Sequence, residues 1–195
     1  MEALTQQLLQ YLSGDGLSQI SKQIGTDEQT TGSVLSAAMP LLVSALARNA
    51  AKPDGATSLQ QALVKDHDGS ILSNMQGYLS DPKAANGAGI LDHVLGDQQP
   101  VVTQGLAKST GLDSNKIGQL LQIAAPLIMG LLGKQQQQEG FDTNSLSSFL
   151  GSQQQQEQQS NPDLMGVLNN LLDADSDGSA LDDIIGMAGK FLGGQ

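Results

Sequence analysis

The apolar segment around Pro40 recurs around Pro126, and this repetition constrains the fold more than any other feature of the sequence. At this offset of 86 residues, residues 17–49 align with residues 103–135 without a gap, and nine of the 33 aligned positions are identical. Because special residues such as glycine and proline are among the identities, the match indicates an internal duplication. The identical pairs are Lys22/Lys108, Gly25/Gly111, Asp27/Asp113, Gly32/Gly118, Leu35/Leu121, Ala38/Ala124, Pro40/Pro126, Leu41/Leu127 and Leu46/Leu132.

Each copy has the pattern of a short helix, a stop and a longer helix. Apolar residues at helical spacing lead to Gly25, a residue type that commonly ends a helix in the left-handed conformation. Thr26 and Gln29 then form the pattern of a capping box, which predicts the start of the longer helix. In the second copy, Gly111 is expected to end the short helix and Asp113 to cap the long one.

A proline lies inside each predicted long helix, where it removes one backbone hydrogen bond and is expected to kink or break the helix. Two such helices would cross at the centre of a pseudo-twofold helical bundle. No alternating β-branched run reaches four residues, so the fold class is predicted to be all-α. Further helices are expected at residues 2–12, 58–65, 71–79, 88–96, 98–109, 144–150, 162–172 and 180–192.

Composition divides the chain into three parts. Residues 1–135 form the predicted duplicated bundle. Residues 136–160 are interpreted as a Gln-rich spacer with a short helix, because Gln tracts at 135–138 and 153–159 are of low complexity. Residues 161–195 are predicted to be an acidic helical tail with an Asp-rich loop.

The charge is concentrated near the C-terminus. Residues 1–134 hold eleven acidic and eight basic residues, whereas residues 135–195 hold nine acidic residues and only Lys190 as a base. This negative field disfavours nucleic acid and anionic membranes, and it favours cations, a protein partner or self-association. The first residues lack the features of a signal peptide, which predicts a cytoplasmic location. The chain has no cysteine, which excludes disulfides and thiolate metal sites.

Several motifs resemble a bacterial family, the domain-of-unknown-function family nine-three-seven with its YidB-like relatives. The resemblance covers most of the chain and implies a helical bacterial protein with no established activity. The motifs are Gly-Thr-Asp-Glu (25–28), Ala-Met-Pro-Leu-Leu (38–42), Ala-Arg-Asn-Ala (47–50), Asp-His-Asp-Gly-Ser (66–70), Ile-Leu-Asp-His-Val-Leu-Gly (90–96), Gly-Leu-Asp (111–113) and Asp-Gly-Ser-Ala-Leu-Asp-Asp (177–183).

An Asp-rich segment in the tail has the spacing of the first half of a calcium-binding loop. Carboxylates stand at loop positions one, three and five, glycine stands at position six, and a serine carbonyl is available at position seven. Ile184 at position twelve cannot bind a cation, so an earlier aspartate would have to close the loop. In the alternative interpretation, Ser179 and Asp182 only cap the last helix. The candidate metal ligands are Asp173, Asp175, Asp177, Ser179, Asp182 and Asp183.

Two weaker patterns contain the histidines. Residues 66–70 repeat part of the Asp-rich pattern but are interpreted as a turn and helix cap. His67 and His93, with nearby aspartates, could supply zinc ligands, yet their spacing matches no known zinc motif. Packing and capping roles are therefore the preferred interpretation of both histidines.

Two uncharged apolar stretches, residues 29–47 and 117–133, approach the length of a membrane span. Their glutamines, serines and prolines favour buried helices of a soluble bundle. No arrangement of nucleophile, base or clustered acids indicates catalysis. The sequence therefore predicts a non-enzymatic structural or protein-interaction protein, tuned by calcium at its tail. The alternative is an envelope-associated protein that uses the two apolar helices.

Overall fold

The computed structural model describes residues 3–160, and every regular element within that range is a helix. The all-α prediction is therefore confirmed. The α-helices and the two 3₁₀ helices, η1 and η2, follow in the order α1 (Leu4–Leu12), α2 (Asp15–Ile24), α3 (Glu28–Ala50), α4 (Pro53–Lys65), α5 (Ser70–Ser73), α6 (Met75–Ser80), η1 (Pro82–Ala85), α7 (Gly87–Leu95), η2 (Gly96–Gln98), α8 (Gln99–Thr110), α9 (Ser114–Glu139) and α10 (Thr143–Ser160).

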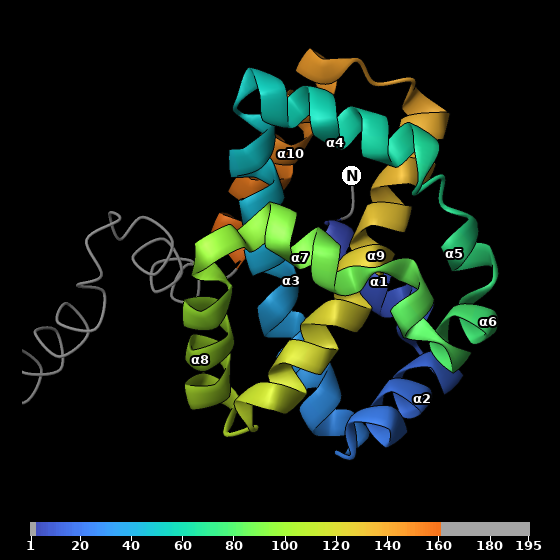
Figure 1. Ribbon diagram of the computed structural model, residues 1–195, viewed down its shortest axis with the longest axis vertical. Helices are drawn as coiled ribbons and strands as arrows, with labels where there is room; N and C mark the ends of the chain where they lie inside the picture. Colours follow the sequence, from blue (N-terminus) through green and yellow to red (C-terminus); the bar gives the residue numbers. More distant parts are fainter. Residues whose placement is uncertain (1–2, 161–195) are drawn as a thin grey trace, which may run out of the picture.

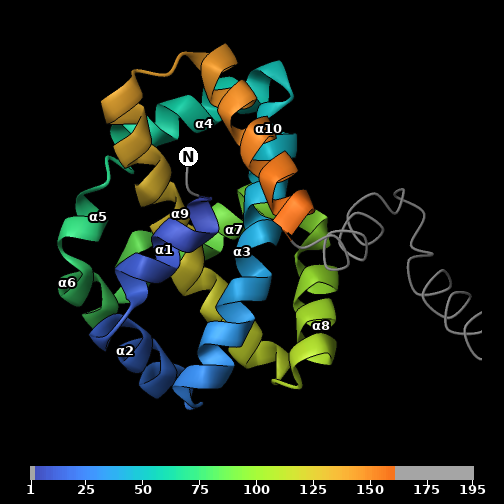
Figure 2. The same ribbon diagram turned by 180° about the vertical axis from the view of Figure 1, so that it is seen from behind.

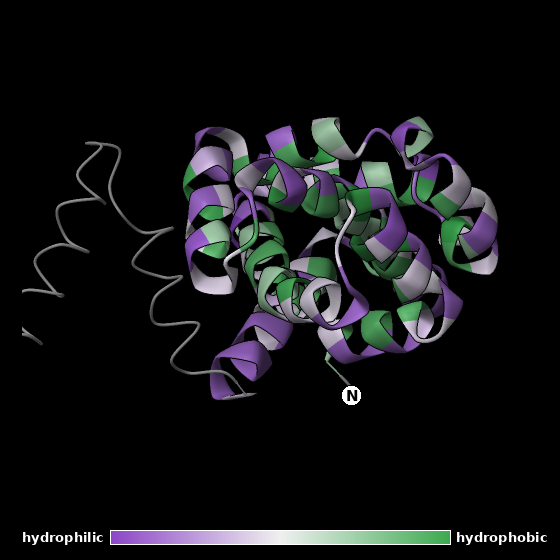
Figure 3. Ribbon diagram, turned by 90° about the horizontal axis from the view of Figure 1, so that it is seen from below, coloured by the Kyte–Doolittle hydropathy of each residue, from purple (hydrophilic) through white to green (hydrophobic). Residues whose placement is uncertain are grey.

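Helices α3 and α9 lie at the centre of the molecule and contact each other, with the other helices packed around them (Figures 1 and 2). Hydrophobic residues gather on the inward faces of these helices and hydrophilic residues on their outer faces (Figure 3). Both central helices are long and apolar enough to cross a membrane, but 72% and 78% of their most apolar stretches are buried within the protein. Their apolar character is thus accounted for by burial in a core.

Residues paired by the 86-residue offset occupy matching positions in their helices. Gly25 ends α2 with φ of 69° and Gly111 ends α8 with φ of 72°, both left-handed. Asp27 accepts a hydrogen bond from the Thr30 amide at 2.7 Å, and Asp113 caps α9 as predicted. The capping box expected at Thr26 is wrong, because the aspartate that follows it caps α3. The duplication itself remains an inference from the sequence.

Both long helices continue through their prolines, so of the predicted kink or break the structure excludes the break. Pro126 has no amide hydrogen, which leaves the Gln122 carbonyl without its usual helical donor. Gly87, at the start of α7, packs directly against that carbonyl, and a Cβ atom there would overlap it. One residue further on, the Tyr78 hydroxyl donates to the Ile123 carbonyl at 2.6 Å. Packing around α9 therefore maintains the helix where its own ladder is interrupted.

The spacer interpretation of residues 136–160 is also wrong. The first Gln tract extends α9 to Glu139, and the second lies inside α10, which packs on α3 and α4. Glutamine is a good helix former, so low complexity does not prevent helix formation once one face finds a partner. Gln153 shows this, because its side-chain oxygen accepts a hydrogen bond from the Leu4 amide at 2.9 Å.

Candidate functional site

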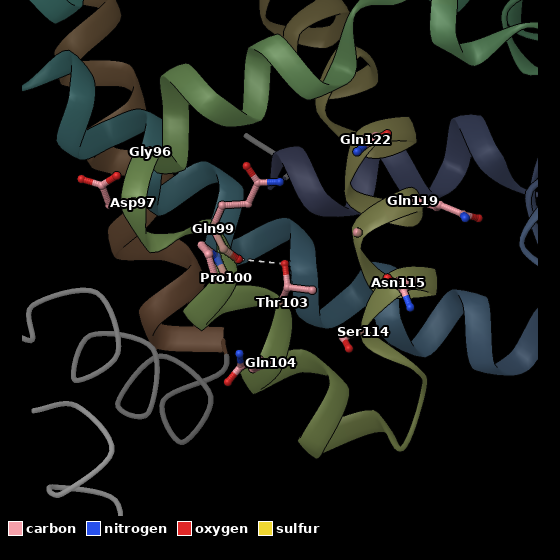
Figure 4. A pocket seen from close by; sticks show the side chains of 11 residues that line it. Gly96, Asp97, Gln99, Pro100, Thr103, Gln104, Ser114, Asn115, Gln119 and Gln122 are labelled. Atoms are coloured by element: carbon pink, nitrogen blue, oxygen red, sulfur yellow. Dashed lines mark hydrogen bonds between the residues drawn. The ribbon is translucent and has the colours of Figure 1, made fainter. Parts of the chain in front are cut away.

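A groove of about 780 Å³ lies between α8 and α9, close to the end of α7 (Figure 4). Residues of α8 form one wall and residues of the first turns of α9 form the other, and η2 contributes two further lining residues. The two helices are joined by the short connection at residues 111–113. The lining residues are Gly96, Asp97, Gln99, Pro100, Thr103, Gln104, Ser114, Asn115, Gly118, Gln119 and Gln122.

The side chains that line the groove are mainly amides and hydroxyls. Asp97 is the one charged residue among them. Thr103 is fixed in position because its hydroxyl donates to the Gln99 carbonyl at 2.8 Å (Figure 4). Amide side chains both donate and accept hydrogen bonds, so this surface is suited to a neutral polar ligand. It offers neither the clustered charges that bind ions nor an apolar pocket.

The groove lies where the two segments paired by the 86-residue offset differ at one pair of positions. In the first copy, Leu17 covers Gly32, and a methyl group placed on Gly32 would lie 3.7 Å from Leu17 Cδ2. The offset pairs Leu17 with Thr103 and Gly32 with Gly118. No atom lies within 4 Å of a methyl group placed on Gly118, so the shorter Thr103 leaves this space open. Sequence reasoning missed the groove, although the leucine-to-threonine difference was visible in the alignment.

The Asp-rich loop, with candidate ligands Asp173, Asp175, Asp177, Ser179, Asp182 and Asp183, lies outside the described residues. Its weaker relative at residues 66–70 is described, and it forms the expected turn and cap. Asp68 accepts a hydrogen bond from the Ser70 amide at 3.0 Å, at the start of α5, and Gly69 is left-handed with φ of 88°.

The two histidines lie on different elements, His67 in the loop after α4 and His93 on α7. Within residues 3–160, no group of three or more His, Cys, Asp or Glu side chains lies together as a metal site would require. Burial lowers the pKa of His67, against the opposing effect of Asp66 and Asp68. His67 is half-buried and so agrees with a packing role, whereas His93 is exposed on α7 and does not.

The other perturbed groups belong to helix caps and to the core. Hydrogen bonds from Thr30, Ser70 and Ser145 lower the pKa values of Asp27, Asp68 and Asp142, respectively. Burial raises the pKa of the Tyr78 hydroxyl well above its ordinary value. None of these groups lines the groove between α8 and α9.

The fold defines a class of all-helical proteins with two long, buried, proline-containing helices at the centre. A family model described as "Bacterial protein of unknown function (DUF937)" matches residues 6–135, which is more than half of the chain. The protein belongs to this bacterial family. No curated protein and no solved structure matches the chain.

Proposed function

We propose that the protein is a non-enzymatic interaction protein that binds a segment of another protein in the groove between α8 and α9. The observation that carries this proposal is the uncovered Gly118, because the same position in the first copy is covered by Leu17. The space next to the glycine is filled by a side chain in the first copy and is open in the second. The open space next to Gly118 is therefore a surface available for a ligand.

The lining favours an extended, polar peptide segment as the occupant. Peptide N–H and C=O groups alternate along a chain, and amide side chains such as Gln104 and Gln119 can bond with both. The lining has no aromatic ring on which a sugar could stack and no Lys or Arg to hold a phosphate. Asp97 and the net charge of −11 favour a segment that carries a basic residue.

A cytoplasmic location and cation tuning belong to the same proposal. The Asp-rich loop would bind calcium weakly, at about 10⁻⁴–10⁻³ M, because it lacks the bidentate glutamate of strong sites. Calorimetric titration of the wild type with calcium and with magnesium tests this. An Asp175→Ala, Asp177→Ala double variant is the comparison. Equal binding by the variant, or no binding at millimolar cation, would reduce the loop to a helix cap.

Site-specific crosslinking tests the groove. A photo-reactive amino acid replaces the exposed Gln119, and crosslinking is carried out in cells of the native host. The same experiment is then repeated with Thr103→Leu, which should fill the groove as Leu17 does in the first copy. Thr57→Leu is the matched control, because Thr57 is an exposed helical threonine on α4 whose hydroxyl also donates to the carbonyl four residues earlier.

We expect a discrete protein adduct in the wild type that persists in Thr57→Leu and is lost in Thr103→Leu. Peptide mapping of the adduct should place the crosslink in a polar segment with a Lys or Arg nearby. An adduct that survives Thr103→Leu would contradict the groove as the binding surface. Failure of Gln119 to form any protein adduct would contradict the interaction role.

A further inference from the structure

Residues 66–73, which we call the contact segment, run from the end of α4 through α5 and pack beside α9 (Figure 1). The His67 carbonyl lies against Gly133, and the Ile71 side chain lies against Gly130. Both approaches are so close that a Cβ atom at either glycine would overlap its neighbour. At these two places the contact segment therefore lies directly on the α9 backbone, with no side chain of α9 in between.

The contact segment is folded by local hydrogen bonds and attached to α9 by apolar packing. The His67 amide donates to the Ala62 carbonyl at 3.1 Å, and the Ser70 amide donates to Asp68 at 3.0 Å. The packing on α9 involves buried side chains such as Leu72, which is 7% exposed. Because these hydrogen bonds do not involve α9, they are kept when the contact segment moves away from that helix.

His67 is the titratable residue of the contact segment that is not exposed, since Asp66 and Asp68 both face solvent. Its imidazole is half-buried, and burial lowers its pKa from 6.5 in spite of the two aspartates. A half-buried imidazole disfavours the charged form because the charge loses hydration. Movement of the segment away from α9 exposes His67 and removes this penalty, so protonation favours the detached state.

The charged groups on the elements around His67 are Asp66, Asp68, Lys65 and Lys134. The ammonium of Lys134, on α9, lies 2.6 Å from the Tyr11 hydroxyl and 5.3 Å from the centre of the Tyr11 ring. Hydrogen bonds from Ser70 lower the pKa of Asp68 below its ordinary value of 3.8, so Asp68 keeps its charge where His67 titrates. A change in docking in mild acid is therefore assigned to His67.

We propose that the contact segment is an acid-sensitive clasp on α9, which is docked while His67 is neutral and opens more often once His67 is protonated. In the detached state His67 has its ordinary pKa of 6.5, so docking is strongest above this pH and weakens as the pH falls through it. Opening uncovers the apolar surface of Leu72. This proposal does not depend on the groove between α8 and α9.

Thiol labelling of the full chain tests the proposal. The chain has no cysteine, so Leu72→Cys introduces a single buried thiol that reacts when the contact segment opens. A pyridyl disulfide reagent measures its reactivity at about pH 7.5 and about pH 5, relative to the same thiol in the urea-unfolded chain at each pH. The measurement is made with His67 present, with His67→Asn, and with His93→Asn as the matched control, because His93 is exposed on α7.

With His67 present, the protection of the thiol should fall at least about threefold from pH 7.5 to pH 5. His93→Asn should show the same fall, whereas His67→Asn should abolish it. A fall of equal size in His67→Asn, or constant protection with His67 present, would overturn the proposal.

Nuclear magnetic resonance titration of the imidazoles gives a second measurement without a cysteine. His67 of the wild type should titrate below 6.5. Gly133→Ala forces the segment away from α9 and should move the midpoint of His67 up toward 6.5, whereas Gly118→Ala, a methyl group in open space on the same helix, should leave it unchanged. A wild-type midpoint at or above 6.5, or equal midpoints in the two glycine variants, would also overturn the proposal.

Discussion

The two segments paired by the 86-residue offset, which the sequence analysis interprets as two copies, share their caps and their prolines but differ in what packs on them. Gly32 of the first copy lies under Leu17, whereas Gly118 of the second faces the open groove. In both places the short helix ends at a left-handed glycine and contacts the long helix that follows. The space between the short and the long helix is thus occupied where the short helix carries Leu17 and open where it carries Thr103.

A second difference lies further along the long helices. The offset pairs Ser44 with Gly130 and Ala47 with Gly133. In the second copy, Ile71 of α5 packs so closely on Gly130, and the His67 carbonyl on Gly133, that a Cβ atom at either glycine would overlap its neighbour. The absence of side chains at Gly130 and Gly133 therefore lets α9 pack against neighbours that the corresponding residues of α3 would exclude, while both segments remain helical.

The largest effect is expected from Gly133→Ala. The new methyl group would overlap the His67 carbonyl, so the free energy of unfolding should fall by about 3 kcal/mol. Gly118→Ala is the matched control on the same helix, where the methyl group meets open space and should stabilise the helix by about 0.5–1 kcal/mol. Urea unfolding of both variants measures the difference. Equal stability of the two would show that the close approach at Gly133 is not real.

An exchange at the groove should give a smaller effect. Leu17→Thr uncovers Gly32 and removes apolar contacts, so it should lower the free energy of unfolding by about 1–2 kcal/mol. Thr103→Leu should leave stability unchanged or raise it by about 0.5 kcal/mol, through better helix propensity and contact with Gly118. Thermal melts of both variants test this. A large loss from Thr103→Leu would mean that the threonine is needed for structure and not for an open surface.

The smallest effect concerns the caps. Asp27 accepts hydrogen bonds from both the amide and the hydroxyl of Thr30, whereas Asp113 accepts one from the Asn115 amide. We therefore expect Asp27→Ala to lower the melting temperature more than Asp113→Ala does. The reverse order would show that the hydroxyl bond contributes nothing.

The cap at Asp27 also makes a pH-dependent contribution. Its pKa is lowered from 3.8 by the bonds to Thr30, so the folded state favours the carboxylate. The stabilisation is fully present above the unfolded value and is lost as the pH falls through the lower, folded value. The difference in melting temperature between wild type and Asp27→Asn should therefore be constant well above the unfolded value of 3.8 and shrink as the pH falls below it. A difference that stays constant as the pH falls below 3.8 would contradict the assignment.

Sequence reasoning was most successful where local chemistry decides. The glycines that end α2 and α8, the Asp113 cap and the two long helices all follow from residue type and spacing. It failed at residues 136–160, because the Gln tracts carry no apolar pattern of their own. The apolar residues of this region, Leu146, Phe149 and Leu150, lie between the two tracts. Their helical state depends on α3 as a neighbour. The groove was also missed, because an open space depends on which side chains do not reach it.

By itself, the sequence determined the all-helical class, the order of helices in each copy and the positions of their caps, since these depend on hydrogen bonds between residues close in the chain. Only the tertiary structure decided that α9 remains helical beyond Pro126, that Glu157 is buried and that Gly118 lies open. Each of these depends on groups far apart in sequence, such as Gly87 against the Gln122 carbonyl, whose proximity arises only when the helices pack.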